Sequence, residues 1–557
     1  MRSPIVNKTI NFLLKKNTTI EISVLLFIFT FAAWFRFRLP NIPLSDPDTW
    51  GYLFPALSSL AGDGFQQTHG RGIAYPLFLR SILSNTFDFF LITKVQHIIG
   101  LSSGLLWWAI WRQWISTLPL RFRFALGIQL VGLIFLAAYL WNANAIFYES
   151  MIRPEAIFPF LALLQTLFII IYIRHRWFDG QSNFVMVMAG SLAMVFALVC
   201  VSAKPSWGFA ATVPLTIVGL GLFGCRSLAK NIPRVSTMLI GVVLCILWLQ
   251  FVPRAVQWKK DERSKEFLPA TMFTVHAPTI SKYLNEARDK AQLSENEMKF
   301  LAKFDQRIAE AKQKTLDTKK YRNLGHDPDY LMYHSDTLSW FPNGNTSKDK
   351  RKFMIDCYLR TVLRFPLEIA TKILWQIKVA FSDLKSSLYQ SNISFQSKFS
   401  GSLKSMDYYK LPEVPKQLSN SYSQVYAKIS ELKGAGVDKF SFGPGIGRFI
   451  ANSFGPFIIG LTMLLWPFFF CCIILKDRCL STEFIPANVV FGVLWASCMG
   501  TTLTVAVVHS FDISRYIHLL SAQHSLIFAT VIASFLIWAA DRLFSGNPAT
   551  IVSKVQN

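Results

Sequence analysis

Long apolar blocks, nearly free of charged residues, constrain this chain more than any other feature. A membrane-spanning helix needs roughly 20 apolar residues, and at least four blocks approach that length: 22–35, 124–140, 157–173 and 184–201. Of the 557 residues, 52% are hydrophobic and only 16% are charged, whereas a soluble protein of this length carries more charge. The sequence therefore predicts an all-α polytopic membrane protein.

The apolar pattern predicts about ten transmembrane helices. They are expected at 20–36, 89–111, 124–141, 154–174, 184–203, 205–224, 235–254, 450–474, 485–507 and 517–539. A basic segment precedes the first helix, but no small-x-small cleavage site follows it, so we expect this helix to be retained. The short connections that carry Lys or Arg are expected in the cytoplasm, together with both termini. These connections are 112–123, 174–183, 226–234 and 476–483.

This threading divides the chain into three parts. An N-terminal transmembrane catalytic module covers 1–254, an extracytoplasmic and mainly helical region covers 255–449, and C-terminal transmembrane helices cover 450–557. The middle region is basic, yet long loops translocate largely regardless of charge. Within it, 284–320 is predicted to be a charged helix. A second helix, at about 361–384, is amphipathic and either lies in the membrane interface or packs against the rest of the region.

Charge and cysteine content limit the partners of the chain. A formal net charge of +24 fits either nucleic acid or a membrane surface. In a polytopic protein it favours the membrane and an anionic lipid, and we expect no nucleic-acid partner. The eight cysteines form no CxxC pair and suggest no disulfide framework. We find no internal repeat, so a transporter built from repeats is not supported.

Two carboxylates, Asp46 and Asp48, lie in the first outer loop, soon after the first predicted helix. An aspartate at the membrane surface can accept a proton from an attacking hydroxyl. The pair could also hold a divalent cation such as Mg or Mn. The alternative is a solvated turn, because Asp-Pro is common in ordinary loops.

A glycine-flanked arginine follows in the same loop, between His69 and Tyr75. Gly70 and Gly72 leave the backbone open around Arg71, whose guanidinium can bind a phosphate through two hydrogen bonds. The alternative is a positive charge that meets lipid headgroups.

The second outer connection holds Glu149, Arg153 and Glu155. Pro154 suits the first turn of the next helix, and a carboxylate at position 155 suits the helix dipole. This structural role explains Glu155 but leaves Glu149 and Arg153 unexplained at a depth where ionisable groups are costly.

Two further clusters are expected on the same side. Lys204 lies at the turn between two apolar segments, either as a functional cation or as a lysine that reaches the interface. His509, Asp512 and Arg515 lie in the last outer loop, where Asp512 and Arg515 could simply pair. Five separate clusters on one side supply carboxylates for base chemistry and cations for phosphate, a composition that fits transfer from an anionic lipid donor.

At these residues the chain resembles the GT-C glycosyltransferases, which use polyprenyl-phosphate-linked sugars. Asp46-Pro47-Asp48 is similar to the catalytic acid of the family's first loop, and the stretches 70–76, 153–155 and 512–516 are similar to bacterial members. These members include lipid A aminoarabinose transferase, protein O-mannosyltransferase-like enzymes and arabinofuranosyltransferases. The resemblance covers most of the transmembrane part, although the large region 255–449 matches no acceptor-binding domain of the family.

The resemblance implies a transferase in the bacterial inner membrane, active on the periplasmic side. Asp46 or Asp48 would be the general base. The resemblance implies no obligatory cofactor, although the two aspartates could hold a divalent cation, Mg or Mn. The expected donor-phosphate ligands are Arg71, Lys204, Arg515, Arg153 and His509. The expected sugar or acceptor contacts are Glu149, Glu155, His69, Tyr75 and Asp512. The acceptor is a glycan, a lipid or a protein. Rival functions are a flippase or transporter of a lipid-linked sugar, and an O-antigen ligase or polymerase that uses a diphosphate-linked donor.

Overall fold

The computed structural model of this protein describes most of the chain. The described residues are 4–67, 71–118, 126–180, 183–222, 228–259, 261–318, 321, 324–339, 341–342, 344, 346–382, 392–409, 411–435, 439–441, 485–508, 516 and 519–545. The predicted helix at 450–474 and the predicted site residues His69, His509, Asp512 and Arg515 lie outside the described residues.

The N-terminal half is helical from its first described residue. Its helices are α1 (Pro4–Arg38), α2 (Trp50–Leu60), α3 (Ala74–Thr86), α4 (Phe90–Ser116), α6 (Leu126–Leu140), α7 (Ala143–Glu149), η1 (Pro154–Ala156), α8 (Phe158–Ile173), η2 (Arg174–Phe178), α9 (Phe184–Ala203), η3 (Pro205–Trp207), α10 (Gly208–Leu220) and α11 (Leu228–Ala255). The predicted segment 184–203 coincides with α9, because its apolar run starts after the N-cap Asn183, which accepts a hydrogen bond from the Met186 amide.

The C-terminal half adds further helices and two short strands. These elements are η4 (Glu262–Glu266), α12 (Phe267–Val275), α13 (Ala277–Asp289), α14 (Glu295–Thr318), η5 (Tyr330–His334), α15 (Ser347–Arg364), α16 (Pro366–Ser382), β1 (Asn392–Ser394), α18 (Gln396–Tyr408), α19 (Lys416–Gly434), β2 (Lys439–Ser441), α21 (Ile485–Val508) and α23 (Ser521–Ser545). The antiparallel pair β1–β2, with Ile393 opposite Phe440, is an exception to the all-α prediction.

Five of the described helices are long and apolar enough to cross a membrane. They are Thr19–Arg38, Phe158–Phe178, Phe184–Ala203, Ile232–Ala255 and Ile485–Val508. A sixth span results if α6 and α7, which meet at an angle of 47°, are counted together. The helix α10 and the apolar part of α23 are shorter, and α4 carries Lys94, His97 and Arg112 within its length.

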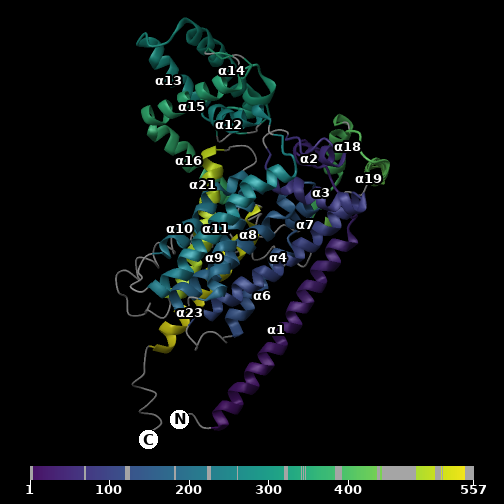
Figure 1. Cartoon of the computed structure of the whole chain (residues 1–557), viewed down its shortest axis with the longest axis vertical. Coiled ribbons are helices and arrows are strands. Elements are labelled where there is room, and N and C mark those ends of the chain that lie inside the picture. The colour runs from purple at the N-terminus through teal and green to yellow at the C-terminus, as the bar shows by residue number, and fades with distance from the viewer. Residues whose placement is uncertain are drawn as a thin grey trace.

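The apolar helices form one bundle with a helical cap at one end (Figure 1). In the bundle α8 packs against α9 and α4, α9 packs against α11, and α10 packs against α21. The cap consists of α12 to α16, while α2, α3, α18 and α19 gather beside it at the same end. The start of α1 and the end of α23 lie at the opposite end. The described site residues lie on three connections: the first outer loop, the second outer connection with the helix start after it, and the Lys204 turn. All three meet at the capped end.

Two predicted helices in the middle region are each divided in two. The segment 361–384 is split at Phe365 because the residue before a proline avoids the helical conformation, and Pro366 starts α16. The segment 284–320 is split into α13 and α14. Ser294 and Glu297 start α14 with a capping box, in which the Ser294 amide donates to Glu297 Oε2 at 2.8 Å.

A separate pair of helices from the middle region covers the end of the bundle. Phe399 and Leu403 of α18 and Leu418 of α19 belong to the same buried apolar cluster as Leu44 and Leu53. Burying a side chain of this size contributes about 1.5–3 kcal/mol. The helices α18 and α19 are thereby held against the loop that carries Asp46 and Asp48.

Candidate functional site

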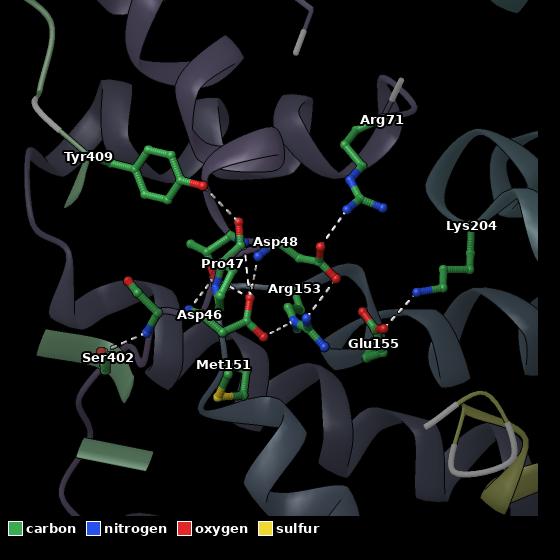
Figure 2. Close-up of polar contacts among 12 residues, drawn as sticks. Asp46, Pro47, Asp48, Arg71, Met151, Arg153, Glu155, Lys204, Ser402 and Tyr409 are labelled. Atoms are coloured by element: carbon green, nitrogen blue, oxygen red, sulfur yellow. Dashed lines mark hydrogen bonds and ion pairs between the residues drawn. The ribbon is translucent and has the colours of Figure 1, made fainter. Parts of the chain in front are cut away.

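A short parallel bridge aligns the first outer loop with the segment that follows α7. The Leu44 amide donates to the Ser150 carbonyl at 2.7 Å, and the Ile152 amide donates to the Leu44 carbonyl at 2.9 Å. Side chains two residues apart point to the same side of an extended chain. Residues 46 and 153 therefore face each other, and Arg153 Nε contacts Asp46 Oδ2 (Figure 2).

The Asp46 side chain stabilises its own loop through hydrogen bonds. Its Oδ1 accepts hydrogen bonds from the amides of Asp48 and Thr49, each at 3.0 Å, and from the Thr49 hydroxyl at 3.2 Å. This is the Asx turn by which an aspartate replaces backbone acceptors ahead of a helix, and α2 begins at Trp50 directly afterwards. With Oδ2 on Arg153, both oxygens of Asp46 have partners.

Asp48 instead bridges two guanidinium groups at the more exposed edge of the cluster, the mouth of the site. Arg71 Nη2 lies 2.6 Å from Asp48 Oδ1, and Arg153 Nη2 lies 2.8 Å from Asp48 Oδ2 (Figure 2). The Asp48 side chain is 30% exposed, compared with 19% for Asp46. Of the two predicted carboxylates, Asp48 is the one that a ligand from solvent could approach more readily.

Two glycines allow close packing in the loop that carries Arg71, one against the Arg71 side chain and one against the backbone of Ser202. A Cβ atom at Gly51 would lie 2.9 Å from Arg71 Cγ, so a larger residue in α2 would push the arginine away from Asp48. A Cβ atom at Gly72 would lie only 1.9 Å from the Ser202 carbonyl oxygen at the end of α9. The first outer loop and the Lys204 turn are thus in close backbone contact at Gly72.

Lys204 and Glu155 form a buried ion pair beside this arginine–aspartate cluster. Lys204 Nζ lies 2.6 Å from Glu155 Oε1, with 5% and 3% of the two side chains exposed. Lys204 Nζ also lies 4.8 Å from the centre of the Tyr516 ring. Figure 2 shows Glu155 and Lys204 on the Arg153 side of the cluster. The predicted residues Arg71, Arg153, Glu155 and Lys204 therefore come together with the two aspartates.

Glu149 lies apart from this group and binds residues that the sequence reasoning did not identify. It accepts hydrogen bonds from Arg36 Nε and Nη2, both at 2.8 Å, and its Oε2 lies 2.8 Å from His97 Nδ1. All three side chains are buried. The signal that could have found Arg36 and His97 is an ionisable residue inside or at the end of an apolar segment.

Tyr75 is linked through hydrogen bonds to the segment that carries Glu149 and Arg153. Its ring is buried, and its hydroxyl donates to Gln96 Oε1 at 2.6 Å. Burial, reinforced by the charge of Glu155, raises the pKa of Tyr75 well above its ordinary value. Gln96 Nε2 in turn donates to the carbonyls of Glu149 and Met151, at 2.8 and 3.1 Å. Tyr75 thus positions the backbone next to Arg153 and lies away from the mouth of the site.

The helix α18 supplies a wall that the sequence reasoning missed. The Ser45 amide donates to Ser402 Oγ at 2.9 Å, and the Tyr409 hydroxyl donates to the Pro47 carbonyl at 3.3 Å (Figure 2). The Tyr409 ring stacks on Trp50 with centroids 5.0 Å apart. Burial, with the charges of nearby Asp48 and Asp46, raises the pKa of Tyr409. No local sequence pattern indicates contacts across more than 350 residues.

A narrow pocket lies between Glu149 and Glu155. Its other polar lining residues are Ser103, Tyr139, Tyr148 and Ser521. The Ser521 hydroxyl is buried and has no hydrogen-bond partner among the described residues. The pocket therefore offers hydroxyl groups behind the ion pairs.

The described residues contain no group of three His, Cys, Asp or Glu side chains that could hold a metal ion. Asp46 and Asp48 lie close enough to share a cation, but the oxygens that would bind it now contact guanidinium groups. The arrangement can bind an anion through its cations and accept a proton through its most exposed carboxylate.

No protein family, curated protein or solved structure matches this chain.

Proposed function

We propose that this protein is a membrane glycosyltransferase of the GT-C type. It would move a sugar from a polyprenyl-monophosphate donor to a glycan, lipid or protein acceptor. The observation that carries this proposal is the cluster of Asp48 with Arg71 and Arg153, next to the Lys204–Glu155 pair, at one end of an apolar helical bundle. The cluster combines a proton acceptor with several cations for a phosphate.

Asp48, rather than Asp46, is the better general base. Asp46 already accepts hydrogen bonds from its own loop, whereas both Asp48 oxygens contact arginines that a donor phosphate would compete for. Binding of the donor would draw Arg71 towards the phosphate and uncover Asp48. Asp48 would then take the proton of the acceptor hydroxyl as its oxygen attacks the anomeric carbon.

The leaving group in this reaction is the lipid phosphate. The bond between the anomeric carbon and the phosphate oxygen breaks, and the phosphate departs with the electron pair. Arg71, Arg153 and Lys204 would stabilise its negative charge in a site shielded by the bundle. Tyr409 and α18 would confine the acceptor at the mouth. His509 and Arg515 stay candidate phosphate ligands, and His69 and Asp512 stay candidate contacts of the sugar or acceptor.

The proposed topology has about ten spans, with α4, α10 and α23 among them. The site would face the periplasm, both termini would lie in the cytoplasm, and the membrane would be the bacterial inner membrane. The proposed orientation, with the site and the N-terminus on opposite sides of the membrane, is supported by the position of the site at the end of the bundle opposite to the start of α1. A divalent cation at Asp46 and Asp48 would require Arg153 to move.

A flippase for lipid-linked sugars is the second candidate. It is favoured by one observation, the group of ionisable side chains buried within the helical bundle, Arg36, Glu149 and His97. Such groups often mark a transport path. A flippase would move the labelled lipid across a vesicle bilayer without breaking its sugar–phosphate bond.

The test is a transfer assay on purified protein with a panel of radiolabelled polyprenyl-monophosphate sugars and membrane extract as acceptor. Wild type should move label into a glycan, lipid or protein fraction, and Asp48→Asn should abolish this. Asp63→Asn, at an exposed aspartate of the same loop, is the matched control and should retain transfer. Transfer by the Asp46→Ala/Asp48→Ala double variant would overturn the assignment. Vesicle crossing without transfer would instead support the flippase.

A further inference from the structure

Gln376 in α16 is a buried polar side chain without an evident structural role. It is fully buried, and neither Oε1 nor Nε2 has a hydrogen-bond partner among the described residues. Leaving an amide unsatisfied in an apolar setting is costly, so a native protein rarely does it without a ligand or a function. Gln376 therefore marks a place where a polar group is expected to bind.

Lys372 lies one helical turn before Gln376, on the same face of α16. Its Nζ donates to the carbonyl of Ala506, in the last turn of α21, at 2.8 Å. No carboxylate pairs with Lys372 in the part of the chain that the structure describes, because Glu368, one turn earlier, binds Lys282. Burial lowers the pKa of Lys372 to about 7. An anion beside this ammonium group would restore its charge.

The ionisable side chain closest to Lys372 on a neighbouring element supplies no negative charge. His276 lies nearby, with Nε2 3.4 Å from the Val507 carbonyl. Burial, together with the charge of Lys372, lowers the pKa of His276 to about 3. It is therefore neutral at ordinary pH. One turn beyond Gln376, Ala380 joins the buried cluster that contains Tyr516, whose ring is the one next to Lys204.

The position of α16 relative to the bundle indicates where the ligand comes from. Lys372 contacts the end of α21, a helix able to span a membrane, so it lies at the level expected for lipid headgroups. Leu374 and Trp375 on α16 are largely exposed, and Lys378 lies over the Trp375 ring at 4.6 Å. Exposed tryptophan and lysine are typical of the membrane interface.

We propose that Lys372 and Gln376 form a binding site for the phosphate of a membrane lipid, between α16 and the end of α21. The ammonium group and the amide Nε2 would donate to phosphate oxygens. The amide Oε1 would accept a hydrogen bond from a hydroxyl next to the phosphate. The site does not depend on the transferase activity and is separate from the Asp48 cluster. It can therefore be tested even if that function is wrong.

Lipid binding to the full-length protein tests the site directly. Purified protein in detergent would be titrated with three probes: a polyprenyl monophosphate, phosphatidylglycerol and inorganic phosphate, with phosphatidylcholine as the zwitterionic comparison. Binding would be measured by native mass spectrometry and by the thermal unfolding midpoint. The variants are Lys372→Gln and Gln376→Leu. The control is Lys378→Gln, which removes an exposed charge from another face of the same helix.

We expect each site variant to weaken binding of the anionic probes about tenfold, as befits loss of one charge-assisted hydrogen bond. Lys378→Gln should bind as wild type does. Preference for the polyprenyl phosphate would identify a carrier-lipid site, and equal binding of phosphatidylglycerol would identify a general anionic-lipid site. Strong competition by inorganic phosphate would show that the phosphate alone is recognised.

The Gln376→Leu variant separates ligand binding from packing. Leucine removes the unsatisfied amide and should keep or raise the thermal midpoint of the lipid-free protein. If Gln376 only fills space, this variant will bind the anionic probes as tightly as wild type. That result, or equal binding by Lys372→Gln, would overturn the proposed site.

Discussion

Arg36, in the last turn of α1, donates two hydrogen bonds of 2.8 Å to the two carboxylate oxygens of Glu149, which ends α7. Two residues after Glu149, Met151 pairs with Leu44, and this pairing brings Arg153 to Asp46. Arg36 therefore fixes the segment from which one wall of the site is built, although it does not touch Asp46 or Asp48.

Removing this arginine should strongly destabilise the protein. In Arg36→Met, the Glu149 carboxylate would lose its main counter-charge while still buried, at a cost of about 3–5 kcal/mol. We expect a lower thermal unfolding midpoint in detergent. The double variant Arg36→Met/Glu149→Gln should recover much of the loss, because it leaves no unpaired charge. Equal destabilisation by the single and double variants would show that the ion pair is not the cause.

The two aspartates of the first loop should respond differently to substitution. Asp46→Ala removes the acceptor for two loop amides and should lower stability by about 1 kcal/mol. Asp48→Asn keeps the shape of the side chain and disturbs only its contacts with Arg71 and Arg153. Thermal unfolding and sugar transfer, measured on both variants, should show a stability defect for Asp46→Ala and an activity defect for Asp48→Asn. The reverse pattern would make Asp46 the base.

Gly72 should tolerate no larger residue. The Cβ atom of Gly72→Ala would lie 1.9 Å from the Ser202 carbonyl oxygen. Overpacking against backbone of this kind costs about 1–3 kcal/mol, and it should also separate Arg71 from Lys204. Gly208→Ala is the matched control, because a Cβ atom there meets nothing within 4 Å. A thermal midpoint unchanged in Gly72→Ala would mean that the loop and α9 are not in contact.

Local signals in the sequence were sufficient for much of the helical framework. The apolar runs predicted α9 and α21 to within one residue, because charge-free segments of this length have few alternatives. The prediction missed the break at Phe365 and the N-cap of α14 at Ser294, although a following proline and a capping box indicate them. Both signals are local, so the sequence alone contains them.

The arrangement of the site could be predicted only in part. Topology was enough to expect Asp48, Arg71, Arg153 and Lys204 at one end of the chain's helices. Their pairing could not be predicted from the sequence, because it depends on the register between Leu44 and Met151 and on the backbone contact at Gly72. The role of Asp46 in its own turn follows from local chemistry, whereas the Tyr409 contact with Pro47 is a tertiary event.

Acid should weaken the helical cap through His276. Burial lowers the pKa of this imidazole to about 3 from an ordinary 6.5, so the unfolded chain binds the proton more readily than the folded protein. The contribution of neutral His276 to the free energy of unfolding is therefore present above pH 6.5 and is lost as pH falls below it. The loss is about 1 kcal/mol between pH 7 and 5.5. The thermal midpoint should fall over this range in wild type and fall less in His276→Asn, which cannot titrate. Parallel curves for the two proteins would rule out His276 as a source of the acid sensitivity.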